Sequence, residues 1–108
     1  MADDKKLIAL LSDADLERRT AAAVVIGALA LKDAVAQQAL LKLTERSPDE
    51  QRVALDALAR TAPKKGVARA LALLASGAPA VRESAFRLLV AAGPEVVGEI
   101  RAPPRPGG

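Results

Sequence analysis

Apolar residues recur every three or four positions along almost the whole chain, the spacing that places them on one face of an α-helix. Short polar, Pro or Gly segments interrupt this pattern at regular intervals. The pattern predicts six helices, over residues 5–12, 16–31, 34–45, 48–61, 67–75 and 79–92, and the start of a shorter seventh over 94–101. The last segment, 102–108, is rich in Pro and Gly and is predicted to be a tail or linker rather than a helix.

Capping residues mark several of the predicted helix boundaries. Asp33 stands where it can cap the third helix, and Ser47 precedes Pro48 at the first position of the fourth. Residues 64–66 (Lys-Lys-Gly) are predicted to form a turn. Gly93 closes the sixth helix, because glycine tolerates the left-handed conformation that follows many helices.

The predicted helices come in pairs, and the pairs repeat. Arg19, Arg52 and Arg82 lie at matching points, 33 and 30 residues apart, near the start of each second helix. The positions three, six, seven and ten residues later form one apolar face in all three copies: Ala22, Val25, Ile26 and Leu29; Leu55, Leu58, Ala59 and Ala62; Ala85, Leu88, Leu89 and Ala92. A single pair cannot bury such a face, but about three stacked pairs can. We therefore expect a core that includes Leu55, Leu58, Leu74, Leu88 and Leu89.

Two stretches of the chain resemble the HEAT repeat, whose consensus has leucines, then Asp-Pro-Asp, then Val-Arg and a run of alanines. They are the segment LIALLSDADLERRTAAA (residues 7–23) and the segment PAVRESA (residues 79–85). The resemblance covers residues 5–92. It implies one all-α domain, residues 1–101, built as an α-solenoid of three antiparallel helix-hairpin repeats with a partial fourth, over residues 5–31, 34–62, 64–92 and 94–101.

The resemblance also implies specific polar contacts. In HEAT repeats a loop Asp and a second-helix Arg form a hydrogen-bonded ladder between neighbouring repeats. Asp13, Asp15 and Arg19 match that pattern, so we expect Arg19 to pair with one of these two aspartates. The later repeats keep Arg52 and Arg82 but have no aspartate in the matching loops. Stacking of the repeats is therefore expected to depend mostly on apolar contacts.

Composition excludes several classes of protein. Hydrophobic residues make up 51% of the 108 residues, with 25 alanines, one Phe, one Met and no Cys, Trp, Tyr or His. An all-β fold, a disulfide, a Cys- or His-ligated metal and a His- or Cys-based mechanism are therefore excluded. The remaining acidic clusters fall at the starts of second helices, where carboxylates cap the helix and oppose its dipole: Asp13, Asp15 and Glu17; Asp49 and Glu50. We expect a non-catalytic protein with no cofactor and no metal.

The N-terminal sequence and the longest uncharged run both favour a cytoplasmic location. Residues 1–6 (MADDKK) do not resemble a signal peptide, because acidic residues are present and no apolar segment follows a basic start. The longest uncharged run, Thr20–Leu31, has 12 residues. A membrane-spanning helix needs about 20. We therefore expect no membrane partner.

Positive charge is concentrated toward the C-terminus. Residues 1–56 have 8 basic and 10 acidic residues, a net charge of −2, whereas residues 57–108 have 8 basic and 3 acidic residues, a net charge of +5. We predict a partner-binding patch formed by Arg60, Lys64, Lys65, Arg69 and Arg87. Such a patch suits an acidic protein partner or nucleic acid, or is ordinary solvated surface. The lack of interleaved aromatic residues disfavours nucleic acid, because bases would have nothing to stack on.

The predicted helix over residues 16–31 is apolar on more than one side. Val24, Gly27 and Leu31 lie outside its repeat face. The flanking second-layer helices can cover these positions, because small Ala and Gly side chains permit close approach. Alternatively, an apolar strip around Val24 and Leu31 receives a partner helix or peptide on the concave surface.

By resemblance, the expected function is that of a protein–protein scaffold or adaptor. The binding surface is expected on the second helices, over residues 16–31, 48–61 and 79–92. The alternative is a basic HEAT-like module that binds nucleic acid. Uncapped end helices also allow oligomerisation by stacking between chains.

Overall fold

The computed structural model describes residues 2–93 and shows an all-helical protein over that range, without strands. The helices are α1 (Ala2–Leu10), α2 (Leu16–Leu29), α3 (Ala34–Leu43), α4 (Pro48–Thr61), α5 (Val67–Leu73) and α6 (Pro79–Ala92). A 3₁₀ turn, η1 (Pro63–Gly66), lies between α4 and α5 and occupies the predicted turn. The all-α class and the six helices predicted for this range are confirmed. The predicted helix over 94–101 and the tail over 102–108 lie outside the described residues.

Local capping explains where several helices begin. The Asp15 carboxylate accepts a hydrogen bond from the Glu17 amide, and the Asp33 carboxylate accepts one from the Ala36 amide. Ser47 caps α4 within a capping box, in which Glu50 reaches back toward the Ser47 backbone. The boundaries of α4 and α6 agree with the prediction, because a proline fixes the first turn of each helix.

Four helices end two residues before the predicted position. The predicted ends were residues 12, 31, 45 and 75, and the observed ends are Leu10, Leu29, Leu43 and Leu73. After α2, Ala30 adopts a left-handed conformation with φ of 51°, and the amide of Leu31 donates to the carbonyl of Ile26. This closing turn is normally signalled by Gly, and the alanine in that position gave no such signal.

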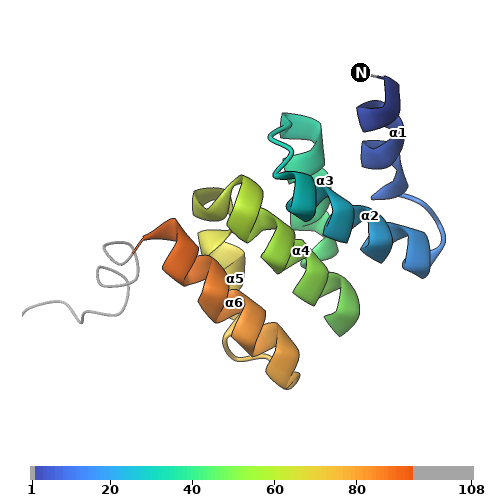
Figure 1. Cartoon of the computed structure of the whole chain (residues 1–108). Helices are drawn as coiled ribbons and strands as arrows, with labels where there is room; N and C mark the ends of the chain where they lie inside the picture. The colour runs from blue at the N-terminus through green and yellow to red at the C-terminus, as the bar shows by residue number, and fades with distance from the viewer. Residues whose placement is uncertain (1, 94–108) are drawn as a thin grey trace, which may run out of the picture.

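The helices form two layers (Figure 1). The second helices α2, α4 and α6 lie side by side in one layer, with α4 in the middle. Behind them, α3 packs against α4, and α5 packs against α6. Helix α1 lies at one end, beside α2 and α3. Each second helix therefore contacts the next along the chain, and only α4 has a second helix on both sides within the described part.

The core lies between the two layers, and most of its predicted members are confirmed. Leu55, Leu58, Leu88 and Leu89 are buried. The prediction for Leu74 is wrong, because Leu74 is 37% exposed and Leu73 is the buried residue, with 8% exposure. The buried Leu43 lies nine residues before Arg52, and Leu73 lies the same distance before Arg82.

The prediction of a buried repeat face is also wrong for part of α2. Ala22 and Ile26 are buried, but Val25 and Leu29 are exposed. The residues that match Val25 in the other repeats, Leu58 and Leu88, are fully buried. The difference follows from position, because α2 is the outermost second helix of the layer and α1 covers it only in part.

Close approach of α2 and α4 depends on small side chains. A Cβ atom added to Gly27 would lie 3.0 Å from the Ala57 Cα and 3.2 Å from its Cβ. Gly27 and Ala57 are both buried at this contact. Gly27 is therefore covered by a neighbouring helix, but this helix is α4 of the same layer and not a helix of the second layer.

Candidate functional site

The strongest candidate site is a shallow groove of about 340 Å³ on the surface of α2 and α4. Helix α2 contributes small and apolar residues, whereas helix α4 contributes two arginines and an aspartate. The lining residues are Ala23, Val24, Gly27 and Ala28 of α2, and Arg52, Val53, Asp56, Ala57 and Arg60 of α4. We call this feature the α2–α4 groove.

The α2–α4 groove exists because its floor is built from small residues. Ala23, Gly27 and Ala57 are buried where the two helices meet, and none of them fills the space above the contact. Val24 stands at the α2 side and is 55% exposed. The groove therefore presents an apolar α2 side that is accessible to a partner.

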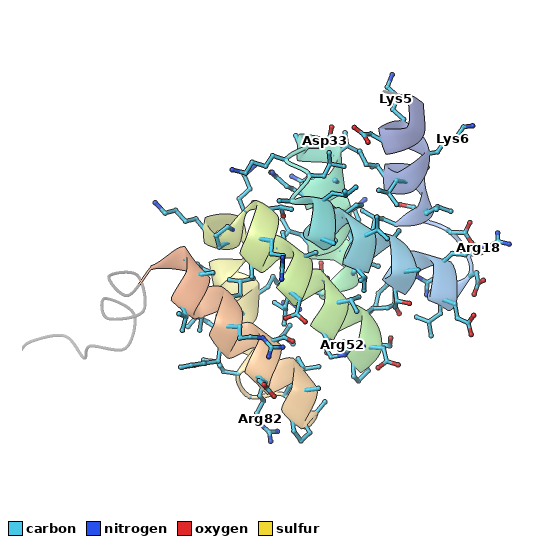
Figure 2. All side chains as sticks on the ribbon, in the orientation of Figure 1. Lys5, Lys6, Arg18, Asp33, Arg52 and Arg82 are labelled. Carbon is cyan, nitrogen blue, oxygen red and sulfur yellow. The ribbon has the colours of Figure 1, made fainter. Side chains whose placement is uncertain are left out.

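The α4 side of the groove is predominantly positive. Arg60 is exposed and Arg52 is half-buried, and both line the groove. The carboxylate of Asp56 lies 3.4 Å from Arg87 Nη2 of α6, so its charge is already compensated. Figure 2 shows Arg52 near the N-terminal end of α4 and Arg82 near that of α6. An acidic group on a partner would complement Arg52 and Arg60.

A buried ion pair joins α2 to α4. Arg19 Nε donates to Glu50 Oε2 at 2.9 Å, and the two side chains are only 12% and 4% exposed. Arg19 Nη1 also donates to the backbone carbonyls of Asp13 and Ala14, at 2.8 and 3.0 Å. Arg19 therefore pairs with Asp13, one of the two expected aspartates, but only through the Asp13 backbone carbonyl, and its carboxylate partner is Glu50.

Arg52 and Arg82, which match Arg19 in the other two repeats, were expected to lack loop-aspartate partners. Arg82 Nη1 donates to the Ser76 carbonyl at 2.7 Å, a contact that spans six residues, as does the contact of Arg19 with Asp13. Neither Arg52 nor Arg82 forms an ion pair within residues 4–93. The loop aspartates are instead approached by Arg18, 3.7 Å from each carboxylate.

The environment of Glu50 shifts its acidity. Burial acts to raise the pKa of Glu50, but hydrogen bonds from Arg19 and from Ser47, with the positive charge of Arg19, outweigh burial and lower it below the usual value. The Ser47 hydroxyl donates to Glu50 Oε1 at 2.8 Å. Glu50 therefore stays ionised at neutral pH, and this carboxylate stabilises the fold.

The five basic residues predicted to form a patch have different neighbours. Arg69 donates to the hydroxyl and carbonyl of Thr44, at 3.1 and 3.0 Å, and Lys65 donates to the Gln37 side chain at 2.8 Å. Arg87 pairs with Asp56 and, at 2.9 Å, with Glu83. Lys64 is exposed in η1, and Arg60 lines the α2–α4 groove. Arg69, Lys65 and Arg87 thus hold neighbouring elements of this chain together.

The two apolar candidates, Val24 and Leu31, lie in different environments. Val24 lines the α2–α4 groove, whereas Leu31 is half-buried and packs against the core.

The sequence did not single out Asp56 as a groove residue. Asp56 lies four residues after Arg52. The residues at the same position after Arg19 and Arg82 are the apolar Ala23 and Phe86. A charged residue at a position that is apolar in the other two repeats was therefore the only sequence signal for Asp56.

Other kinds of site lack support in the described part of the chain. Residues 4–93 contain no group of three or more carboxylates that could hold a metal ion. None of the described helices has the length and apolar character needed to cross a membrane. Comparison of the chain with protein-family models, curated proteins and solved structures finds no match in any of the three.

Proposed function

We propose that this chain is a non-catalytic protein-interaction module in which three HEAT-like helix hairpins stack as a short α-solenoid. Three observations support the proposal. The second helices lie side by side in one layer. The arginines Arg19 and Arg82 hold matching loops by matching hydrogen bonds. An ion pair also links each pair of neighbouring second helices, Arg19–Glu50 between α2 and α4 and Arg87–Asp56 between α4 and α6.

The module binds its partner in the α2–α4 groove. The observation that carries this proposal is the combination of an accessible apolar side at Val24 with the positive side at Arg52 and Arg60. A short amphipathic helix fits such a groove, with small apolar residues on one face and an acidic residue beside them. The apolar contact supplies most of the affinity, and the charges chiefly speed association and set orientation.

Nucleic-acid binding has less support. Arg69, Lys65 and Arg87 make hydrogen bonds or ion pairs with groups of this chain. The single Phe offers little stacking surface. A cytoplasmic adaptor that recognises an acidic, partly apolar protein segment agrees better with these contacts.

The proposal is tested with a library of helical peptides displayed on phage and selected on the full chain. Binding of the selected peptides is measured by fluorescence anisotropy. We expect V24D and R60E each to weaken binding by about tenfold or more, as is typical of residues that matter at an interface. The matched controls V35D and K64E change exposed residues outside the groove, and we expect them to change affinity less than about twofold.

Three outcomes would overturn the proposal. One is that selection yields no peptide whose binding responds to V24D. Another is that the control variants weaken binding as strongly as the groove variants. The third is tight binding of an oligonucleotide that is insensitive to V24D and falls by decades between low and moderate salt, which would establish the nucleic-acid alternative.

A further inference from the structure

The outer end of the layer at α2 exposes residues whose equivalents are buried elsewhere. Ala21 and Val25 are exposed, Val25 to 42%, whereas the matching residues on α4, Ala54 and Leu58, are fully buried. Beside them, an apolar depression of about 320 Å³ lies between α1 and α2. We define the N-face by the exposed or half-buried apolar residues at this end: Leu7, Leu10, Ala21 and Val25.

The opposite end of the layer shows the complementary situation. Phe86 and Val90 of α6 are 53% and 54% exposed. Counted from the repeat arginine, they match Ala23 and Gly27 of α2, which are buried where α4 packs against that helix. We define the C-face by Phe86 and Val90. Each end of the described layer thus exposes the positions that form one half of the α2–α4 interface, with larger side chains on the C-face.

The two ends also carry charged residues that match the Arg19–Glu50 ion pair. Glu50, which receives Arg19, lies two residues before Arg52, and Glu17 lies two residues before Arg19. Arg82 is the third-repeat equivalent of Arg19, and it already makes the matching loop contact with Ser76. Glu17 and Arg82 are exposed, and neither forms an ion pair with another residue of the described range.

We propose that a second copy of this chain docks head to tail, so that the C-face of one copy packs on the N-face of the next. In this arrangement α6 of the first copy lies beside α2 of the second, in the order in which α2 lies beside α4 within one chain. The two helices lie farther apart than α2 and α4, because Phe86 and Val90 are larger than the matching Ala23 and Gly27. Arg82 then donates to Glu17 of the neighbouring copy, as Arg19 donates to Glu50. The proposal rests on the stacked arrangement of the proposed function. It shares Val24 with the α2–α4 groove, because Val24 matches Ala57, but it does not use Arg60.

A second copy fits these ends better than an unrelated partner, because both halves of the interface are present on one chain. Their overall charges are also opposite. Residues 1–31 contain 4 basic and 5 acidic residues, net −1, whereas residues 64–93 contain 5 basic and 1 acidic, net +4. Attraction between these ends favours head-to-tail contact over either like pairing.

Head-to-tail contact is heterologous, so it does not stop at a dimer unless a ring closes. Sedimentation velocity of the full chain at low salt, over a wide concentration range, should therefore show a series of oligomers. We expect E17R and R82E each to raise the apparent dissociation constant by about tenfold or more, because each places like charges at the joint. An equimolar mixture of the two variants restores opposite charges at every joint and should return association to nearly the wild-type level.

Two control variants and one variant of the N-face distinguish a loss of the interface from unfolding and from a general effect of charge. E45R and R46E make the same charge changes at exposed sites outside residues 1–31 and 64–93 and should leave the oligomer distribution unchanged. A21E adds a charge to the N-face at an exposed helical position. We expect A21E to abolish association while circular dichroism and the thermal midpoint stay close to those of the wild type.

The proposal is overturned if the wild-type chain is monomeric at all concentrations. It is also overturned if the mixture of E17R and R82E associates no better than either variant alone. R60E, which alters the α2–α4 groove, should leave self-association intact. Loss of peptide binding and loss of self-association can thus be assigned to different surfaces.

Discussion

Glu50 has two structural roles through one carboxylate. It completes the capping box at the start of α4 with Ser47, and it receives Arg19 from α2. The first role is local in sequence, and the second joins elements 31 residues apart. Loss of this carboxylate therefore weakens both a helix terminus and the contact between two helices.

The pKa of Glu50 gives a prediction for stability against pH. The folded-state pKa lies below the unfolded value, so the unfolded chain binds more protons as the pH falls through that interval. The contribution of Glu50 should be complete at neutral pH and should be lost as the pH falls from about 5 through the folded pKa. We expect E50Q to cost about 1.5–3 kcal/mol of unfolding free energy at pH 7, the usual value for hydrogen bonds to charged groups.

Urea unfolding of the wild type and E50Q at pH 7, 5, 4 and 3 measures this effect. The difference between the two proteins should shrink as the pH falls. The matched control is E45Q, because Glu45 is exposed at the end of α3, and this variant should show little difference at any pH. A gap between wild type and E50Q that stays constant down to pH 3 would contradict the assigned role.

At the scale of single residues, the sequence predicts which arginines donate hydrogen bonds better than it predicts which groups accept them. The repeat pattern identified Arg19 and Arg82, and both make the matching loop contact. The pattern did not predict that Glu50 would receive Arg19, because that pairing depends on how far α4 is shifted along α2. Leu74 was misplaced for a different reason. It lies eight residues before Arg82, as Leu11 lies before Arg19, whereas the buried Leu73 follows the nine-residue spacing of Leu43 from Arg52.

At the scale of helices, starts were predicted more accurately than ends. Pro48 and Pro79 fix the first turns of α4 and α6 by their own geometry, and the structure confirms both starts. Helix ends depend on whether the next residue adopts a left-handed conformation, and at Ala30 this happens without glycine. The packing of the following α3 in the second layer must compensate for the strain that alanine carries there.

Replacing Ala30 by glycine should therefore stabilise the protein. Glycine removes the left-handed penalty of about 1–2 kcal/mol but adds about 0.5–1 kcal/mol of unfolded-state entropy, so we expect a net gain of about 0.5 kcal/mol. The matched control is A28G, two residues earlier in the same helix, which should destabilise by about 1 kcal/mol. Thermal unfolding of both variants checks the difference in sign. Equal losses in the two variants would show that Ala30 carries no strain.

At the scale of the whole molecule, stability should decline from the middle helix toward α1. Helix α4 packs against α2, α3 and α6, whereas α1 packs mainly against α2 and less against α3 and has half-buried apolar residues. In stacked architectures each unit is stabilised mainly by its neighbours, so the end unit opens first. We therefore expect amide hydrogen exchange to be slowest in α4 and fastest in α1.

Exchange measured by NMR at low protein concentration tests this order without interference from self-association. A uniform exchange rate across all six helices would indicate that only global unfolding exposes the amides.

The sequence could predict the layered, all-helical architecture from its periodicity. It could not predict that Val25 and Leu29 are exposed, because they have the same apolar character as their buried equivalents and differ only in lacking a neighbour.

The pairing of Arg19 with Glu50 also bears on how such a chain could lengthen by tandem duplication of its coding sequence. The unit over residues 34–62 carries both an acceptor, Glu50, and an arginine, Arg52, at the position that matches Arg19. A duplicate inserted directly after this unit would place Arg52 of the original opposite Glu50 of the duplicate, so the new junction would inherit the same ion pair. Duplication of the last unit would give no such junction, because Ala80 replaces the acceptor there. The first unit carries the same combination, Glu17 and Arg19, so the first and middle units can each be duplicated with the ion pair kept at the new junction, whereas the last unit cannot.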